Sequence, residues 1–109
     1  MSDEVLVVAV VKPKPGQEEA VEEAFAKLVE PTHAEDGCLT YAMHRDKRTP
    51  GQLVFVERWE SQEKLGGHVN ADHFKGALEA TKDMLAEPLQ ILILEPVAGG
   101  DASKGVLFP

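Results

Sequence analysis

Two different periods of hydrophobic residues divide the chain into strands and helices. Residues 5–11 and 89–95 are largely apolar on both faces, which is typical of buried strands. Residues 38–45 alternate with a period of two, and residues 53–60 form a second strand segment whose successive side chains point to opposite faces. Because a Thr-Pro-Gly turn sequence at residues 49–51 separates them, these two segments are predicted to form a hairpin.

The segment that begins at Gln17 has the period of an amphipathic helix. Its apolar residues recur at i, i+3, i+4 and i+7, and acidic residues occupy the opposite face and the first turns. Pro31 is expected to kink or end this helix, because proline inside a helix removes a hydrogen bond and clashes with the preceding turn.

Further helical segments are predicted between the hairpin and the last strand. Ser61 is expected to cap a short helix that ends near Gly66 and Gly67. Asn70 or Asp72 is expected to cap the amphipathic helix that follows.

The order of these elements predicts an α+β, ferredoxin-like βαββαβ domain, with a four-stranded antiparallel sheet and its crossover helices on one side. The other sheet face then has no cover, and an exposed apolar sheet is an aggregation hazard. A second copy of the chain is the simplest cover, so we expect a homodimer. The domain is predicted at residues 1–97, followed by a flexible tail at residues 98–109 whose apolar tip packs on the partner subunit.

Composition and charge limit the possible partners. The 109 residues suffice for one domain with its own core, and the net charge of −8 argues against nucleic acid and anionic membranes. The only cysteine, Cys38, excludes an internal disulfide and suits a reducing compartment. Neither a signal peptide nor an apolar run of ~20 residues is present, so a cytoplasmic protein without a membrane partner is expected.

A carboxylate and two aromatic side chains share one face of the strand at residues 53–60. Phe55, Glu57 and Trp59 point the same way, because side chains alternate along a strand. Burial on that face would raise the pKa of Glu57. Arg45 on the neighbouring strand, or a dimer contact, is the expected partner, and a structural contact is favoured over catalysis.

Two histidines follow this strand. His68 and His73 are five positions apart, which places them roughly 140° apart on a helix. Since no carboxylate or cysteine is seen to complete a ligand set, no metal site is predicted. His68 is a candidate base, whereas capping and surface solvation explain His73 equally well. The hydroxyl of Tyr41 needs a hydrogen-bond partner or a ligand.

Three motifs resemble a known family. They are EDGCLTY at residues 35–41, FVERWES at residues 55–61 and LGGHVNADHF at residues 65–74. On these motifs the chain resembles the antibiotic biosynthesis monooxygenase family over residues 5–96. That family comprises dimeric α+β barrel proteins and includes small cofactor-free oxygenases, a bacterial quinol monooxygenase among them. The resemblance implies a cavity between the helices and the sheet of each subunit, and sheet-to-sheet packing in the dimer.

The resemblance also implies a function, namely a cofactor-independent monooxygenase that oxidises a small electron-rich aromatic, such as a quinol or polyketide phenol, with O2. His68 would remove a phenolic proton, Asn70 would hydrogen-bond the developing oxyanion, and Glu57 is a further candidate catalytic residue. The expected substrate contacts are Trp59, Tyr41, Phe74 and His73.

The chain departs from the haem-degrading branch of the family, which is expected to carry an early asparagine that residues 5–11 lack. No cofactor is therefore predicted. The alternatives are an isomerase or other proton-transfer enzyme for a small phosphorylated ketone, and a non-catalytic dimeric binding module. The absence of a basic cluster near the histidines argues against a phosphorylated ligand.

Overall fold

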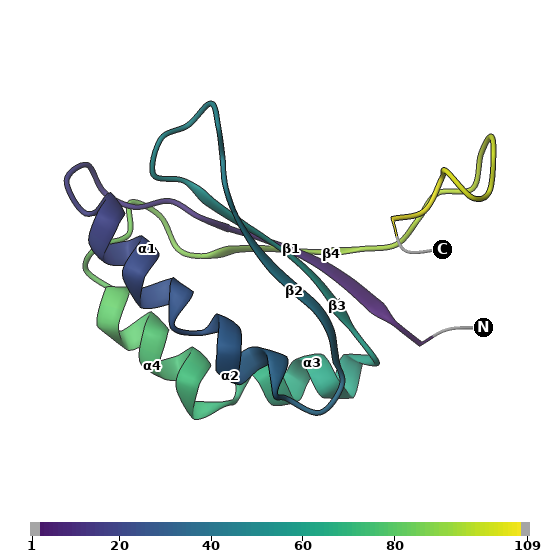
Figure 1. Cartoon of the computed structure of the whole chain (residues 1–109), viewed down its shortest axis with the longest axis horizontal. Coiled ribbons are helices and arrows are strands. Elements are labelled where there is room, and N and C mark those ends of the chain that lie inside the picture. Colours follow the sequence, from purple (N-terminus) through teal and green to yellow (C-terminus); the bar gives the residue numbers. More distant parts are fainter. Residues whose placement is uncertain (1–2, 108–109) are drawn as a thin grey trace.

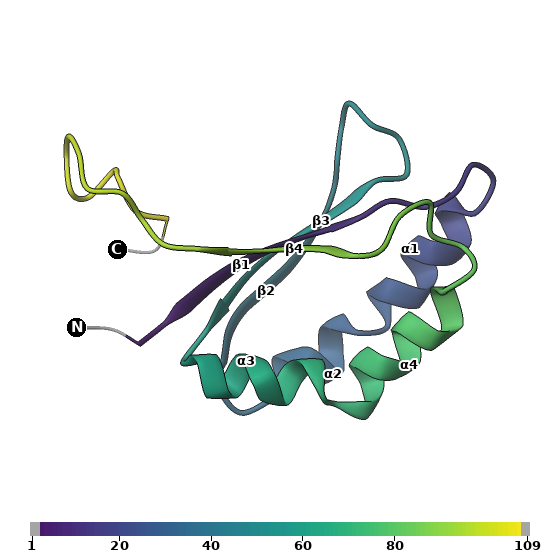
Figure 2. The ribbon, with the colours of Figure 1, turned by 180° about the vertical axis from the view of Figure 1, so that it is seen from behind.

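The computed structural model describes residues 3–107, which form one antiparallel sheet covered by helices on one side (Figures 1 and 2). The elements in chain order are β1 (Val5–Val11), α1 (Glu18–Ala26), α2 (Val29–His33), β2 (Cys38–Arg45), β3 (Leu53–Trp59), α3 (Gln62–Val69), α4 (Asp72–Thr81) and β4 (Gln90–Leu94). The strand order is β2-β3-β1-β4, and every neighbouring pair is antiparallel. The predicted ferredoxin-like fold is confirmed.

The register of the central strands places Glu57 in the middle of the sheet. Glu57 lies opposite Val7 of β1 on one side and opposite Tyr41 of β2 on the other. All three side chains are buried, because alternate residues of these strands face the helices. The carboxyl group of Glu57 therefore lies within an otherwise apolar layer.

Only one face of the sheet is buried within a single chain. In β1, Val7, Ala9 and Val11 are buried, and the residues between them are half-buried. β4 forms a sheet edge, and all its residues are exposed, Ile93 to 57%. The single chain leaves the second face of β1 and β4 without cover, so the burial of these strands on two faces by a partner subunit stays a prediction.

The first predicted helix divides into two. α1 ends at Ala26 and α2 begins at Val29, so the break comes before Pro31. Pro31 is the third residue of α2, where a backbone N–H has no partner within the helix, and proline is tolerated there.

The boundaries of α3 and α4 differ from those predicted. Ser61 caps α3 as expected, its hydroxyl accepting a hydrogen bond from the backbone N–H of Lys64 at 3.2 Å. α3 continues through both glycines to Val69, and the side chain of Asn70 donates to the carbonyl of Gly66 at its end. Neither Asn70 nor Asp72 caps α4, because Ala71 occupies the N-cap position.

The segment after β4 extends away from the helices (Figure 1). It closes a short turn in which the backbone N–H of Gly105 donates to the carbonyl of Asp101 at 2.9 Å. Phe108 and Pro109, which belong to the predicted apolar tip, lie outside the described residues.

Gly37 closes the turn that leads into β2, and an alanine there is expected to destabilise the fold. Its φ of 89° lies in the left-handed region, where a side chain costs about 1–2 kcal/mol, and an added Cβ would overlap the Lys64 side chain. Gly16→Ala is the matched control, because Gly16 has a φ of 90° and open space around it. Urea unfolding should show a larger loss for Gly37→Ala, and equal losses would exclude a contribution from Lys64.

Candidate active site

A cavity of about 260 Å³ lies between the sheet and the helices. Its lining is Val7, Ala9, Val11, Phe25, Tyr41, Phe55, Glu57, Gln62, Leu65, Gly66, His68, Val69, Phe74, Leu89, Ile91 and Ile93. Only Tyr41, Glu57, Gln62 and His68 bring polar side chains to this wall, and neither lysine nor arginine is among the described lining residues. Such a cavity suits a small, largely apolar ligand.

His68 is the basic group of the cavity wall. α3 presents its imidazole, which is 2% exposed, to a ring of aromatic side chains. The imidazole centroid lies 4.7 Å from that of Trp59, 4.9 Å from that of Phe74 and 5.3 Å from that of Tyr41. Burial lowers the pKa of His68, so the neutral imidazole is favoured near pH 7.

Glu35 determines which nitrogen of His68 carries the proton. Nδ1 of His68 lies 2.7 Å from Oε2 of Glu35. An ionised carboxylate only accepts hydrogen bonds, so Nδ1 of the neutral ring carries the hydrogen and Nε2 keeps its lone pair. Nε2 makes no hydrogen bond to any described residue, and Glu35 is outside the cavity lining. Nε2 of His68 is therefore the nitrogen that has a free lone pair and is available to a ligand.

His73 binds the same carboxylate oxygen as His68. Its Nε2 lies 2.7 Å from Oε2 of Glu35, and its side chain is 28% exposed. His73 does not line the cavity, and it neither caps a helix nor stands alone at the surface. The structure thus places it behind His68, on the side of Glu35.

Glu35 forms a cluster of candidate metal ligands with the two histidines. The ligand atoms of Glu35, His68 and His73 all lie within 4.8 Å of one another and could hold a divalent cation. The statement that no carboxylate completes the set is therefore wrong. The strand pairing is the feature that brings Glu35 near the histidines. Cys38 at the start of β2 pairs with Trp59 at the end of β3, so the turn before β2 must lie beside the start of α3.

Glu57 has a different partner from the one predicted. Its carboxyl group, 4% exposed, accepts a hydrogen bond from Nε1 of Trp59 at 2.9 Å. Arg45 lies near the hairpin end of β2 and pairs instead with Glu22 at 2.7 Å. Burial raises the pKa of Glu57 to about 7, against the opposing effect of the Trp59 N–H. A substantial fraction of Glu57 is therefore a neutral acid at physiological pH.

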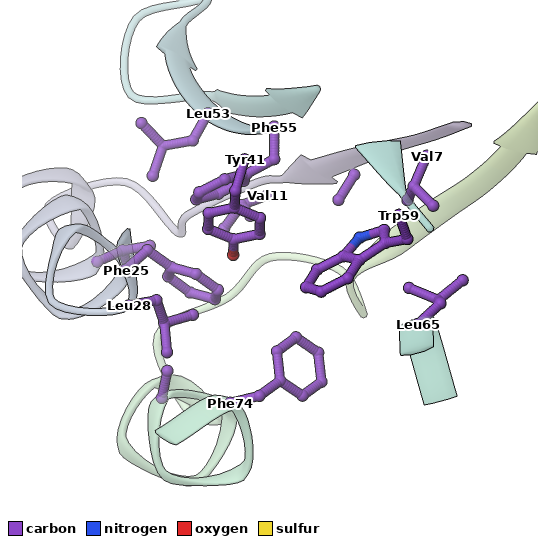
Figure 3. Close-up of a cluster of buried hydrophobic side chains, with 13 residues drawn as sticks. Val7, Val11, Phe25, Leu28, Tyr41, Leu53, Phe55, Trp59, Leu65 and Phe74 are labelled. Carbon is purple, nitrogen blue, oxygen red and sulfur yellow. The ribbon is translucent and has the colours of Figure 1, made fainter. Parts of the chain in front are cut away.

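The aromatic residues divide between the wall of the cavity and the layer behind it. Tyr41 and Phe74 line the cavity, and Figure 3 shows the Tyr41 hydroxyl pointing toward the space between Phe25 and Phe74. Burial raises the pKa of Tyr41, so its phenol stays protonated and can donate a hydrogen bond. Trp59 is fully buried and does not line the cavity. It lies behind the wall, where its ring packs near His68 and its N–H donates to Glu57.

Asn70 does not reach the cavity. Its side chain is exposed, and its amide donates to the Gly66 carbonyl at 2.8 Å. The interaction with an oxyanion that the resemblance implied requires a loop facing the cavity, and the structure does not have one there.

The fold and the site define a class of protein, a ferredoxin-like α+β domain with an apolar cavity. The wall of this cavity contains one buried histidine and one buried carboxyl group. The chain belongs to the antibiotic biosynthesis monooxygenase family, whose sequence profile matches residues 4–80. Family membership and the names of its relatives support a monooxygenase-type function.

Similar proteins come from several bacteria. The Escherichia coli protein named probable quinol monooxygenase YgiN is 35% identical over 100 residues, covering 83% of this chain and 95% of YgiN. The solved structure of PA3566 from Pseudomonas aeruginosa has a TM-score of 0.83 and 31% identity, over 90% of this chain and 98% of that one. The uncharacterized Synechocystis protein sll1783 is 29% identical over 84% of this chain, and this chain spans 62% of the length of sll1783.

None of the helices in the described part of the chain has the length and apolar character of a membrane-spanning helix.

Proposed function

We propose that the protein is a cofactor-independent monooxygenase that oxidises a small electron-rich aromatic, a quinol or a polyketide-type phenol, with O2. The observation that carries this proposal is a single neutral imidazole in the wall of an apolar cavity, with its free nitrogen available to a ligand. A volume of about 260 Å³ lies at the lower limit for ligand pockets and favours a compact ring system.

His68 begins the proposed reaction as a general base. Its Nε2 accepts the phenolic proton, and Glu35 stabilises the resulting imidazolium through Nδ1–H. The phenolate transfers one electron to O2, and the two radicals combine to form a carbon–oxygen bond. His68 then returns its proton to the peroxide.

Elimination of water completes the reaction. His68, neutral again, accepts the proton from the attacked carbon as the O–O bond breaks and the carbon becomes a carbonyl. The departing hydroxide takes up a proton and leaves as water. One phenol and one O2 thus give one quinone and one water, with no external reductant. Glu57, whose pKa is about 7, is a second proton donor beside the departing oxygen.

The proposed active form is a homodimer. Its support is the exposed apolar surface of the sheet, where Leu92 and Leu94 are each at least 40% exposed in the single chain. The tail beyond residue 97 is proposed to pack on the partner subunit. The single thiol of Cys38 supports a reducing, cytoplasmic location.

The first test is oxygen uptake by the metal-stripped protein with a reduced naphthoquinol, measured against the uncatalysed autoxidation rate. We expect enzyme-dependent uptake that survives a chelator and needs no added flavin or haem. Turnover of a ketone substrate without oxygen would instead select the isomerase alternative, although the described residues that line the cavity include no cation for a phosphate group. Ligand binding without any turnover would reduce the protein to a binding module.

A further inference from the structure

The geometry points to a divalent transition-metal site at Glu35, His68 and His73, outside the substrate cavity. The three side chains contribute one carboxylate oxygen and two imidazole nitrogens, the donor set that Zn²⁺ binds in His₂Glu sites. Glu35 is only 15% exposed and His68 only 3% in their side chains, so these ligands are already largely desolvated.

The ligand atoms of the cluster already lie close together and must adjust their spacing to accept an ion. Both histidine nitrogens lie 2.7 Å from the same oxygen of Glu35. Metal–ligand bonds of 2.0–2.2 Å in a tetrahedron put neighbouring ligand atoms about 3.3 Å apart. Each nitrogen must therefore move about 0.6 Å from the oxygen, and the two nitrogens, which lie within 4.8 Å of each other, must reach the same spacing of about 3.3 Å. A water completes the four ligands.

The surrounding contacts hold the three ligands in place before any ion arrives. Asp36 pairs with Lys64 of α3, and the backbone N–H of Glu60 donates to the Gly37 carbonyl at 2.8 Å. These two contacts tie the turn that carries Glu35 to the start of α3. A preformed site loses less conformational entropy on binding, which favours affinity.

Metal binding changes the tautomer of His68. A metal at Nδ1 requires the lone pair of that nitrogen, so the neutral ring must carry its hydrogen on Nε2, the nitrogen available to the substrate. Since Glu35 and His73 do not line the cavity, the ion itself does not meet the substrate there. The change of tautomer predicts that the metal inhibits turnover, a prediction that rests on the proposed role of His68 as the base.

The binding test uses Zn²⁺ alone, titrated calorimetrically into the metal-stripped full chain. We expect one site per chain in the wild type and an affinity at least about 100-fold lower in His73→Gln and Glu35→Gln. His44→Gln is the matched control, because His44 is exposed and lies outside the cluster. Wild-type protein that binds no Zn²⁺, or His73→Gln that binds as tightly as the wild type, would overturn the site.

The tautomer is tested by nitrogen NMR of the imidazoles, which needs no turnover. Zn²⁺ should move the ring hydrogen of His68 from Nδ1 to Nε2, and an unchanged tautomer would refute the inhibitory role. Oxygen uptake with and without Zn²⁺, expressed relative to each protein's own metal-free rate, should fall in the wild type and not in His73→Gln. Equal inhibition of both proteins would contradict the site, whereas absence of any uptake bears only on the proposed enzyme activity.

Discussion

Replacing His68 with asparagine is expected to lower the turnover number by about 10²–10⁴-fold, the usual contribution of a positioned general base. The asparagine amide can still donate to Glu35 from the position of Nδ1, but no atom replaces Nε2. The substitution therefore removes the base and keeps the contact that orients it. Steady-state oxygen uptake with a reduced naphthoquinol is the measurement.

Two comparisons make the result specific to the base. His44→Asn changes an exposed histidine whose ring lies within hydrogen-bond distance of the Val54 carbonyl, and it should retain wild-type turnover. His68→Ala leaves space in the cavity wall, so added imidazole should restore part of its activity. Both His68 variants should elute from a sizing column like the wild type, because the proposed dimer surface lies on the other sheet face. Full activity in His68→Asn would refute the assigned role.

The parts of the fold that follow from local pattern were predictable. The β2–β3 hairpin follows from two strand patterns on either side of a Thr-Pro-Gly turn, and the Ser61 cap follows from a hydroxyl just before a helical period. The inward position of Glu57 between Phe55 and Trp59 needed only the two-residue period of a strand.

The contacts of the site depend on tertiary structure and were mostly missed. Glu35 is 33 residues from His68 in sequence, and only the sheet register brings them together. The partner of Glu57 is the neutral Trp59 N–H and not an opposite charge, because a neutral donor also satisfies a buried acid. The burial of β4 could not be judged from its apolar residues, since burial depends on what covers a sheet edge.

The stability of the protein should fall as the pH rises from about 4.5 to above 7, because of Glu57. Its pKa is about 7 in the folded protein and 4.5 ordinarily, so between these values the folded state binds more protons than the unfolded state. The contribution of Glu57 to stability is therefore fully present below pH 4.5 and is lost as the pH rises through about 7. A difference of this size corresponds to about 3 kcal/mol in the free energy of unfolding.

Glu57→Gln isolates this contribution, because glutamine resembles the neutral acid in shape and its side-chain oxygen can still accept the Trp59 N–H. Urea unfolding of both proteins at pH 5 and pH 8, at one protein concentration, gives the comparison. The variant should gain about 2–3 kcal/mol relative to the wild type between these pH values, whereas Glu63→Gln on the exposed surface of α3 should not. Parallel pH profiles for wild type and Glu57→Gln would mean that Glu57 is no more protonated in the folded protein than in the unfolded one. A neutral acid beside His68 would then be lost from the proposed mechanism, and the proton for the departing oxygen would come from His68 alone.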